Sequence, residues 1–537
     1  MNTRFFLALT TLAAASTAMA QSAIDAYNIT PHELRGTARF IGMGGAFTSL
    51  GGDITSMSQN PAGLGLYRSS DIGLTFDISI RNYNYKTDVS NNSDNATKAY
   101  FDNFGYVGAM QLGGAMKFFQ WGVSYNRLAS FDRISGGYNR PTGTSLSNYI
   151  AGYTGGVPSG ALLDSKDHDP FFDSSEDWLS IVAYNSYFIN NTLGSDDQYT
   201  GQFQNGTESD ALYKYHEKGY QDEYDISFAG NVSDLVYWGL GVGIVDMSYT
   251  REGFYSESSS GALIYNTDTD RLATGNSAFD LYNTRYVSGT GANLKFGVII
   301  RPADMFRVGL AVHTPTWMHL THNGYADTDY RFTPDNGRTT EGSFSTPTYE
   351  YRSRLNTPWR LMVGASVTLG SSAIVSVDYE RVAYNDMKMK EEAYGIDGYL
   401  SGGFTDNKYA NEDIKTMFQA ANIIRIGAEF RPTRSISLRA GFNYQTSNVT
   451  SKAADTTGNP QIYTSGTDPS YSFDKDTYNV CLGIGYRYKA WYADLAYQYT
   501  RRSSTLHAYT PFNGVSTPSA DLTDSYNNIV ISTGFRF

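Results

Sequence analysis

The stretch that decides the fold is GTARFIGMGGAFTSLGGDITSMSQNPAGLGL, residues 36–66. It is rich in Gly, Ala and Ser, and its charged side chains are Arg39 and Asp53. Glycine pairs such as Gly44 and Gly45 permit tight turns and close packing against a wall. Alternating, strand-like patterns begin only at Asp71 and then recur to the end of the chain. A compact segment of small residues ahead of many strands predicts a plug inside a barrel.

Residues 1–20 have the features of a secretory signal peptide. Arg4 supplies a positive charge, residues 5–15 form a short apolar run, and Ala18-Met19-Ala20 resembles a cleavage site. Cleavage would leave Gln21 first, and because this residue is not a cysteine, we expect no lipoprotein anchor. The sequence therefore predicts an exported protein.

The composition is typical of an outer-membrane β-barrel. Aromatic residues make up 15% of the chain, with 43 Tyr and a single cysteine, Cys481, and the mean hydropathy is −0.38. Aromatic girdles at the two membrane interfaces would explain the tyrosines. Composition alone leaves a large secreted β-sandwich or solenoid open. The net charge of −12 argues against a nucleic acid partner.

Alternation along the chain predicts about fourteen strands. In DIGLTFDISIR, residues 71–81, Ile72, Leu74 and Phe76 face one side, and Gly73 and Thr75 face the other. The predicted strands are 71–85, 101–116, 120–132, 219–231, 236–250, 287–300, 305–316, 350–369, 373–386, 419–430, 435–448, 474–488, 491–503 and 526–537.

The lengths of the links between these strands distinguish a membrane barrel from a sandwich. Links after even-numbered strands are short, as at residues 489–490, whereas links after odd-numbered strands are long, the largest being 132–218. Short turns at one end, long loops at the other and an even number of strands are typical of transmembrane barrels. A sandwich gives no reason for such sorting.

The last predicted strand ends on Phe537, like the C-terminal signal that barrel-assembly machinery reads. Both ends of the barrel segment then lie on the short-turn side, which we expect to be periplasmic. In lipid, every strand edge must be paired, so the barrel must close. Fourteen strands enclose a lumen too wide for wall side chains alone to fill. We therefore predict an all-β protein in the Gram-negative outer membrane: an N-terminal hatch, 21–68, inside a transmembrane barrel, 69–537, of about fourteen antiparallel strands.

The hatch sequence resembles that of the FadL/TodX family of outer-membrane transporters for hydrophobic compounds. The resemblance lies in the Met-Gly-Gly-Ala-Phe turn, the Gly-Gly-Asp that follows, and the Asn-Pro-Ala-Gly-Leu at residues 60–64. Further similar stretches are GANLKFGVIIRP at 291–302, VGLAVHTPT at 308–316, TPWRLMVGASV at 357–367, VDYERVAYNDMK at 377–388 and RIGAEFRP at 425–432.

The resemblance implies a fourteen-stranded barrel with a plug and passive uptake of hydrophobic, fatty-acid-like molecules. The ligand would be collected by the outer loops, enter a pocket beside the hatch and leave sideways through the wall. Implied surroundings are outer-membrane lipid and lipopolysaccharide, with the barrel-assembly machinery contacting Phe537, and we expect a monomer. Two alternatives stay open: a barrel that acts as scaffold or shuttle for a secretion system, and a surface receptor for haemin. The acidic outer loops leave the ligand of this chain open.

Six hatch residues are candidates for the ligand path. Residues 60–62 could form a gating turn, although a structural turn, in which Asn caps and Pro fixes φ, is the favoured interpretation. Close packing alone would equally explain the glycines. The candidates are Gly44, Gly45, Phe47, Asn60, Pro61 and Ala62.

A second candidate set consists of charged residues predicted to face the lumen. We expect them mainly to pair with one another and with the plug, and the alternative is an anchor for a ligand carboxylate. They are Lys295, Arg307, Arg425, Glu429, Arg439 and Arg487.

Other patterns predict no cofactor, metal or catalytic site. His313, His319 and His322 do not suit a metal, because residues 319 and 322 point to opposite faces of a strand. The acidic residues in 164–177 lack the EF-hand spacing. Common catalytic motifs are absent from the sequence, so we expect no enzyme. Within the longest loop, residues 147–163 and 178–188 are predicted to be apolar lids over the barrel mouth.

Overall fold

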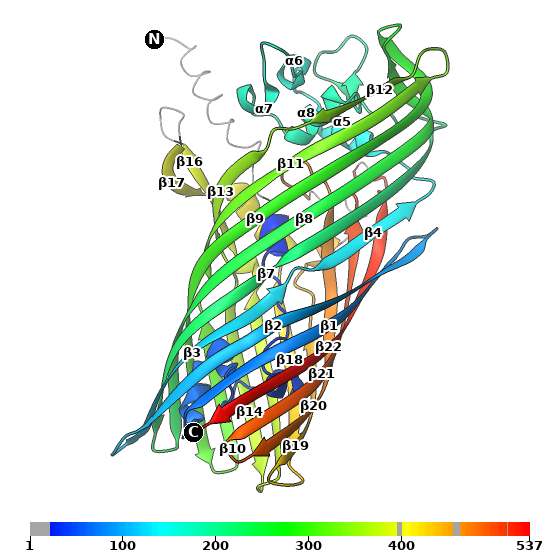
Figure 1. The fold of residues 1–537 in the computed structure, drawn as a ribbon. Helices are drawn as coiled ribbons and strands as arrows, with labels where there is room; N and C mark the ends of the chain where they lie inside the picture. The colour runs from blue at the N-terminus through cyan, green and yellow to red at the C-terminus, as the bar shows by residue number, and fades with distance from the viewer. Residues whose placement is uncertain (1–21, 395–399, 455–461, 513) are drawn as a thin grey trace, which may run out of the picture.

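The computed structural model describes residues 22–394, 400–454, 462–512 and 514–537. The predicted signal peptide, residues 1–20, lies outside them. The chain forms one closed antiparallel barrel of fourteen wall strands, as predicted. Closure is direct: β1 (Asp71–Lys86) pairs with β2 (Asn91–Gln111) on one edge and with β22 (Ser519–Arg536) on the other (Figure 1).

Several wall strands are interrupted, so that two elements follow one another along a single wall position. In chain order after β2, the wall contains β3 (Met116–Ser130) continued by β4 (Arg133–Asn139), β7 (Glu208–Val232), β8 (Val236–Asn266), β9 (Arg271–Ala303), β10 (Phe306–His313) continued by β11 (Trp317–Pro334), β13 (Tyr349–Asn356) continued by β14 (Trp359–Leu369), β15 (Ala373–Ala383) continued by β16 (Lys388–Tyr394), β18 (Ala420–Phe430), β19 (Ile436–Gln445), β20 (Tyr471–Tyr488), β21 (Trp491–His507) and then β22.

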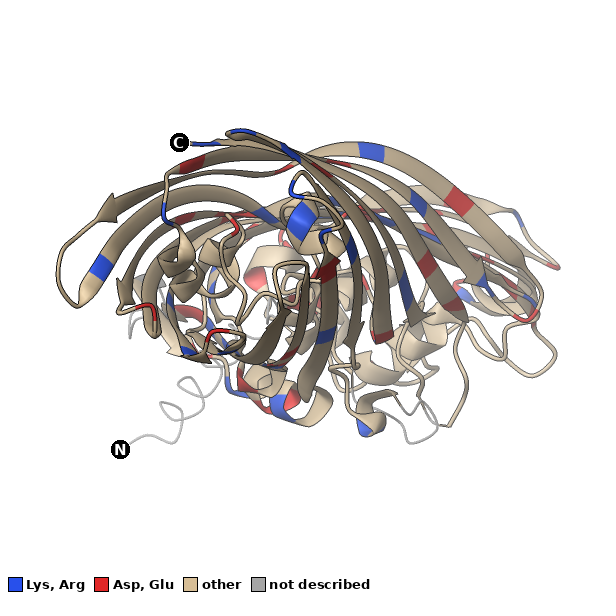
Figure 2. Ribbon diagram, turned by 90° about the horizontal axis from the view of Figure 1, so that it is seen from below, with Lys and Arg blue, Asp and Glu red and all other residues tan. Residues whose placement is uncertain are grey.

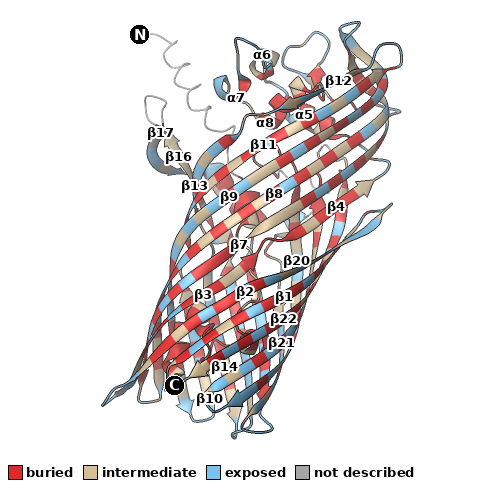
Figure 3. Cartoon of the chain, in the orientation of Figure 1, coloured by how far each residue is buried: buried red, intermediate tan, exposed pale blue. Residues whose placement is uncertain are grey.

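Side chains alternate between the outer and inner faces of the wall. Ile78 on β1, Val242 on β8 and Leu482 on β20 are exposed on the outside, whereas their inward neighbours Ser79 and Cys481 are buried. The alternation is visible as stripes along the strands (Figure 3). An apolar outside and a polar or small-residue inside are what a barrel in lipid requires.

The connections at one end of the barrel are all short turns, and the longest connections lie at the other end (Figure 1). Contrary to the prediction, not every outer connection is long: β1 joins β2 through residues 87–90, and β8 joins β9 through residues 267–270, because these strands extend beyond the predicted ones. Strands β8 and β9 run for 31 and 33 residues, well beyond the predicted 236–250 and 287–300. Their extensions carry polar side chains on the outer face, so the apolar alternation that marks a strand in lipid is lost there. The predicted loop 132–218 is likewise shorter, because β4 and β7 take up its two ends.

The hatch residues, blue in Figure 1, lie inside the barrel, and helical turns are visible within the ring of strands from the short-turn end (Figure 2). Their regular elements are α2 (Ala23–Asn28), α3 (Ala38–Gly42), α4 (Ser56–Gln59) and the 3-10 helix η1 (Pro61–Leu66). Helix α3 packs against β20 and β21, and η1 packs against β7 and β8. Among the described residues, no helix is both long and apolar enough to cross a membrane.

A folded cap, residues 140–207, covers the barrel mouth (Figure 1). Its buried side chains include Leu146, Ile181 and Phe188, and they share one apolar cluster with wall residues Tyr255 and Phe332. The predicted apolar lids, 147–163 and 178–188, lie largely in its helices. Its elements are α5 (Leu146–Thr154), α6 (Ser159–Leu162), α7 (Pro170–Asp173), α8 (Trp178–Asn185), β5 (Asn190–Asn191) and β6 (Tyr199–Thr200).

Smaller elements complete the outer end of the barrel. They are β12 (Thr340–Ser345), η2 (Tyr384–Asp386), β17 (Leu400–Asp406), α9 (Lys408–Met417) and α10 (Ser451–Ala454). Helix α9 contacts α2 of the hatch and η2 of the wall.

Candidate functional site

The described residues of the lumen enclose cavities, of which two concern the hatch. The first, called cavity A, measures about 130 Å³ and is lined from β1, β3, β19, β20, β21 and β22. The second, cavity B, measures about 140 Å³ and is lined from β3, β7, β9, β10, β14 and β18. Both are lined largely by amide, hydroxyl and charged side chains. Each could therefore hold a polar group as well as an apolar one.

The hatch contributes one shared wall to both cavities. Residues 30–35, called the divider, line cavity A and cavity B alike. The Ser130 amide of β3 donates to Oε2 of Glu33 at 3.1 Å, and an Arg425 Nη2 lies 3.3 Å from Nε2 of His32. Polar contacts therefore attach the divider to the wall on two sides.

The hydrogen-bonded wall is interrupted between β2 and β3. Their ladder ends where Asn103 pairs with Asn126. Beyond this point β2 continues to pair with β1, whereas the upper end of β3 and then β4 pair with β7. We call this break between β2 and the β3–β4 bend the wall gap. Its position borders cavity A, because Ser130, Phe131 and Arg133 around the bend line that cavity.

Side chains, instead of backbone, bridge the wall gap. Lys98 Nζ of β2 lies 2.5 Å from Oδ1 of Asp132 at the bend. The Tyr100 hydroxyl of β2 donates to Oδ2 of the same carboxylate at 2.7 Å. Ser130 Oγ, on the same side of the gap as Asp132, also donates to this carboxylate at 2.8 Å and holds it in place. Such contacts can break without unravelling a strand.

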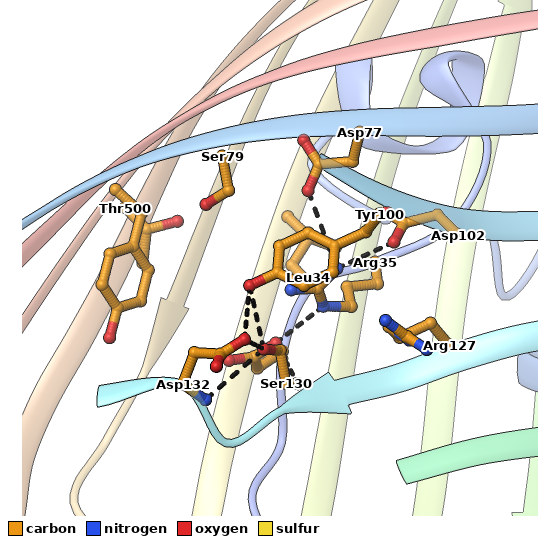
Figure 4. Close-up of polar contacts among 12 residues, drawn as sticks. Leu34, Arg35, Asp77, Ser79, Tyr100, Asp102, Arg127, Ser130, Asp132 and Thr500 are labelled. Carbon is orange, nitrogen blue, oxygen red and sulfur yellow. Dashed lines mark hydrogen bonds and ion pairs between the residues drawn. The ribbon is translucent and has the colours of Figure 1, made fainter. Parts of the chain in front are cut away.

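Arg35 of the divider lies at the inner side of the gap, pointing at two buried carboxylates (Figure 4). Its Nη1 is 2.8 Å from Oδ1 of Asp102 on β2 and 3.6 Å from Oδ2 of Asp77 on β1. Its Nε donates to Glu33 at 2.7 Å. The hatch is thus ion-paired to β2, which borders the gap, and to the neighbouring strand β1.

The six predicted hatch residues seal the plug against the wall. Gly44 has φ +63°, and a Cβ there would lie 2.7 Å from the Phe442 backbone nitrogen. A Cβ on Gly297 of β9 would lie 1.8 Å from Oδ1 of Asn60, and one on Gly239 of β8 would lie 2.2 Å from the carbonyl carbon of Pro61. Wall glycines therefore make room for the hatch turn. None of the six, namely Gly44, Gly45, Phe47, Asn60, Pro61 and Ala62, is among the residues lining cavity A or B.

Five of the six predicted lumen charges are engaged inside the barrel. Lys295 Nζ lies 2.5 Å from Glu223 and 2.7 Å from Asp225. Arg425 pairs with Glu380. These contacts link one wall strand to another, and Lys295 and Arg425 also line cavity B.

The remaining charges link the hatch to the wall or lie at the rim. Glu429 accepts from Arg39 of the hatch at 3.2 Å and from Arg439 of β19 at 2.7 Å. Arg307 donates to the Leu50 carbonyl of the hatch at 3.3 Å. Arg487 is exposed near the short-turn end of β20. Pairing with one another and with the plug thus accounts for most of the set.

The three histidines do not converge. His313 Nε2 lies 2.8 Å from the Gln59 carbonyl, and His322 is buried against Ser353. His319 faces outward and is exposed. In the described part of the chain, no group of three His, Cys, Asp or Glu residues could hold a metal ion.

Sequence reasoning did not single out the residues around the wall gap and cavity A. Asp77, Ser79 and Arg81 continue the polar face of the first strand, so the two-residue period of a β-strand predicts that they point inward. Their meeting with Arg35 and Asp132 depends on where β3 leaves β2, and no residue pattern marks that point.

The molecule was compared with known proteins. No protein-family model and no curated protein sequence matches it. Among solved structures, it is similar to a Pseudomonas aeruginosa FadL homologue, with a TM-score of 0.50, 14% sequence identity, and coverage of 95% of this chain and 99% of that one. The chain has a FadL-like fold. The predicted resemblance is thereby confirmed at the level of architecture.

Two further solved structures are similar to this FadL-like barrel. The P. putida toluene transporter TodX gives a TM-score of 0.48 at 14% identity, covering 94% of this chain and 99% of its own. The CymD monoaromatic hydrocarbon channel gives 0.45 at 13% identity, with the same coverage. Closed wall, apolar outside and plugged lumen together are the architecture of a Gram-negative outer-membrane β-barrel.

Proposed function

We propose that this FadL-like barrel lets hydrophobic small molecules, including fatty-acid-like amphiphiles, cross the outer membrane passively. The observation that carries the proposal is the wall gap beside cavity A. A solute in cavity A would meet Ser130 and Phe131 on its way to the gap, and no backbone hydrogen bond of the wall would have to break.

The surroundings of the gap suit release of an apolar solute into lipid. On β7 next to the bend, Tyr224 and Ile226 are exposed toward the short-turn side. Lys218 of β7 and its ion-pair partner Glu252 of β8 lie toward the outer loops. The gap thus lies at the outer rim of the apolar band. Transfer from a cavity directly into lipid avoids exposing apolar surface to water, which costs roughly 25 cal/mol per Å². The named relatives, a toluene transporter and a hydrocarbon channel, agree with an apolar cargo.

The oligomeric state and the surroundings predicted from the sequence are part of the same proposal. A single chain closes the barrel, so we expect a monomer surrounded by outer-membrane lipid and lipopolysaccharide. The backbone of Phe537 is hydrogen-bonded to Ser70 at 2.9 and 3.0 Å, and its aromatic ring is exposed. We expect barrel-assembly machinery to contact this ring during insertion. We expect no nucleic acid, metal or cofactor to be required.

The test is entry of an apolar dye through an intact outer membrane. The chain is expressed in a Gram-negative host that lacks its own channel of this fold, and its assembly is verified by heat-modifiable migration on gels. We expect N-phenylnaphthylamine fluorescence to rise several-fold faster than in cells carrying an assembled eight-stranded barrel without a lumen. Equal rates in the two strains would contradict the proposal.

A further inference from the structure

Arg81 differs from every other buried cation in the described chain. Five arginines and one lysine are less than a tenth exposed. The other five all have carboxylates within 4 Å, whereas the ion pairs of the described residues include none for Arg81. These five are Arg133, Arg251, Lys295, Arg425 and Arg439.

The Arg81 guanidinium is nonetheless fixed in place. Its Nε donates to Ser79 at 3.1 Å and its Nη1 to the Asp132 carbonyl at 2.6 Å. Its Cζ lies 4.8 Å from the ring centre of Tyr526 and 5.4 Å from that of Tyr100. Only 1% exposed, it lines cavity A. Glu33 attracts this cation only from beyond ion-pair distance, so an anion supplied by the cavity within that distance would stabilise the buried charge further.

No carboxylate of the cavity wall takes that place. Glu33 lies in the divider and is bound by Arg35 at 2.7 Å. Asp474 is shared by Arg133 at 3.4 Å and Arg502 at 3.7 Å. Glu217 is bound by Arg251 at 2.8 Å. All three acids that line the cavity therefore already have cations.

Beyond Arg81, cavity A presents an array of amides and hydroxyls. Gln498 Nε2 donates to Asn479 Oδ1 at 3.0 Å, and Thr500 Oγ1 donates to the same oxygen at 2.5 Å. Asn479 Nδ2 in turn donates to Asn443 at 3.2 Å. Side-chain amides offer donors and acceptors together, which is the complement of a ligand with several hydroxyl groups. A ligand with hydroxyl groups could add hydrogen bonds to this array, whereas a bare hydrocarbon would only remove these polar groups from water, at a cost.

One side of the same cavity is aromatic. Phe131 and Tyr249 pack edge to face, with ring centres 5.1 Å apart, and Tyr384 also lines the cavity. Phe131 is next to the bend that borders the wall gap. An apolar group attached to a polar head could therefore lie along these rings toward the gap.

We propose that cavity A binds the head of an acidic, glycolipid-like amphiphile, with a sugar acid at Arg81 and its alkyl chain along Phe131. This proposal rests on the proposed function and names its ligand class. The anion would receive the N–H groups of Arg81 that the wall does not use, and the amides around Asn479 would receive the sugar hydroxyls.

Three probes with eight-carbon chains separate the features of such a head. Octyl glucuronide carries acid and hydroxyls, octyl glucoside carries hydroxyls alone, and octanoate carries acid alone. Binding is measured by calorimetry on the full-length barrel in lipid nanodiscs. We expect the glucuronide to bind about tenfold or more tightly than either other probe, in line with one charge-assisted hydrogen-bonded pair.

Variants assign this preference to residues. Arg81→Gln should reduce glucuronide affinity to that of the glucoside, and Arg81→Lys should retain part of the preference. Lys475→Gln is the matched control, because this cation lines cavity A but pairs with Asp521 at 3.4 Å. Since Arg81 also holds the Asp132 carbonyl, a second variant avoids the bend: Asn479→Ala with Gln498→Ala should reduce the preference for glucuronide over octanoate.

Equal affinity of all three probes, or an unchanged glucuronide preference in the folded Arg81→Gln variant, would overturn the inference. If either of these results were found while the wild-type barrel still admitted N-phenylnaphthylamine, the proposed function would stand and only the ligand assignment would fail. Loss of dye entry with preserved glucuronide binding would contradict the proposed function while supporting the ligand site.

Discussion

The Nη1 atom of Arg35 in the hatch lies 2.8 Å from Oδ1 of Asp102 in β2, a carboxylate that is only 2% exposed. The same guanidinium reaches Asp77 of β1 at 3.6 Å. Strand β2 borders the wall gap, and β1 is its neighbour on the other side. The divider between the cavities is thus ion-paired to the place where the wall is weakest.

Arg35→Gln should release the divider from the wall. Removing one partner of a buried ion pair costs about 3–5 kcal/mol, because the carboxylates stay buried without their cation. We expect faster amide hydrogen exchange in residues 30–36, with β8 and β9 unchanged. The triple variant Arg35→Gln, Asp77→Asn, Asp102→Asn also removes the two unpaired carboxylates. It should partly restore protection from amide hydrogen exchange in residues 30–36. Unchanged exchange in Arg35→Gln would show that the ion pairs do not hold the divider.

Gly297→Ala should prevent the hatch turn from seating. The new Cβ would lie 1.8 Å from Oδ1 of Asn60, so either the turn or β9 must move. We expect an assembled barrel that leaks ions in planar bilayers. Adding Asn60→Ala removes the clashing atom and should reduce the leak. Gly113→Ala, in a turn where an added Cβ meets open space, is the control. A tight Gly297→Ala barrel would contradict the assigned packing.

Trp178→Ala should loosen the cap and leave the barrel assembled. Trp178 is 3% exposed and packs on Phe171, with ring centres 4.7 Å apart, and on Tyr349 of the wall at 5.6 Å. Loss of a buried Trp side chain costs about 3–5 kcal/mol. Limited proteolysis on intact cells should then cut within 140–207. Phe172→Ala, at a 67% exposed neighbour, should have no such effect.

The cap should lose stability as the pH rises toward 6. Asp177 caps α8 by accepting from the Leu179 and Ser180 amides, and burial raises the pKa of its carboxyl to about 6. Because the folded pKa lies above the usual value of 3.8, the folded cap binds more protons than the unfolded one between those values. Stability should therefore fall from about pH 4 to pH 6 and stay constant above. An asparagine can still accept hydrogen bonds at the N-terminus of α8 but does not titrate. In Asp177→Asn, the amide exchange rates of α8, corrected for the intrinsic effect of pH on exchange, should therefore show no such dependence. An equal dependence in both proteins would exclude Asp177 as its source.

Much of the architecture could be predicted because lipid imposes a strict pattern. Outward apolar residues such as Ile78 and Leu482 recur at every second position, and the turns at the short-turn end are all short. The pattern fades where strands leave lipid, which is why the outer halves of β8 and β9 were missed. The breaks at Pro315 and Pro358, one inside the predicted strand 305–316 and one inside 350–369, also depend on pairing with neighbours.

The candidate site was less accessible from the sequence. The hatch motif correctly indicates a plug, yet Asn60 and Gly44 pack against wall glycines, away from both cavities. The wall gap depends on where β3 changes partner from β2 to β7, a tertiary event with no local signature. The role proposed for Arg81 depends on the absence of a carboxylate within 4 Å among the described residues. Only the three-dimensional structure shows this absence.

The most direct test of the central claim closes the wall gap reversibly. Lys98→Cys and Asp132→Cys, in a Cys481→Ser background, are joined by a short bismaleimide with a cleavable disulfide. The control joins Lys218→Cys to Glu252→Cys, an ion pair of 2.9 Å across the continuous β7–β8 ladder. We predict that closing the gap slows N-phenylnaphthylamine entry about tenfold and that reduction restores it, with the control unaffected. Unchanged entry with the gap closed would contradict passage through the wall.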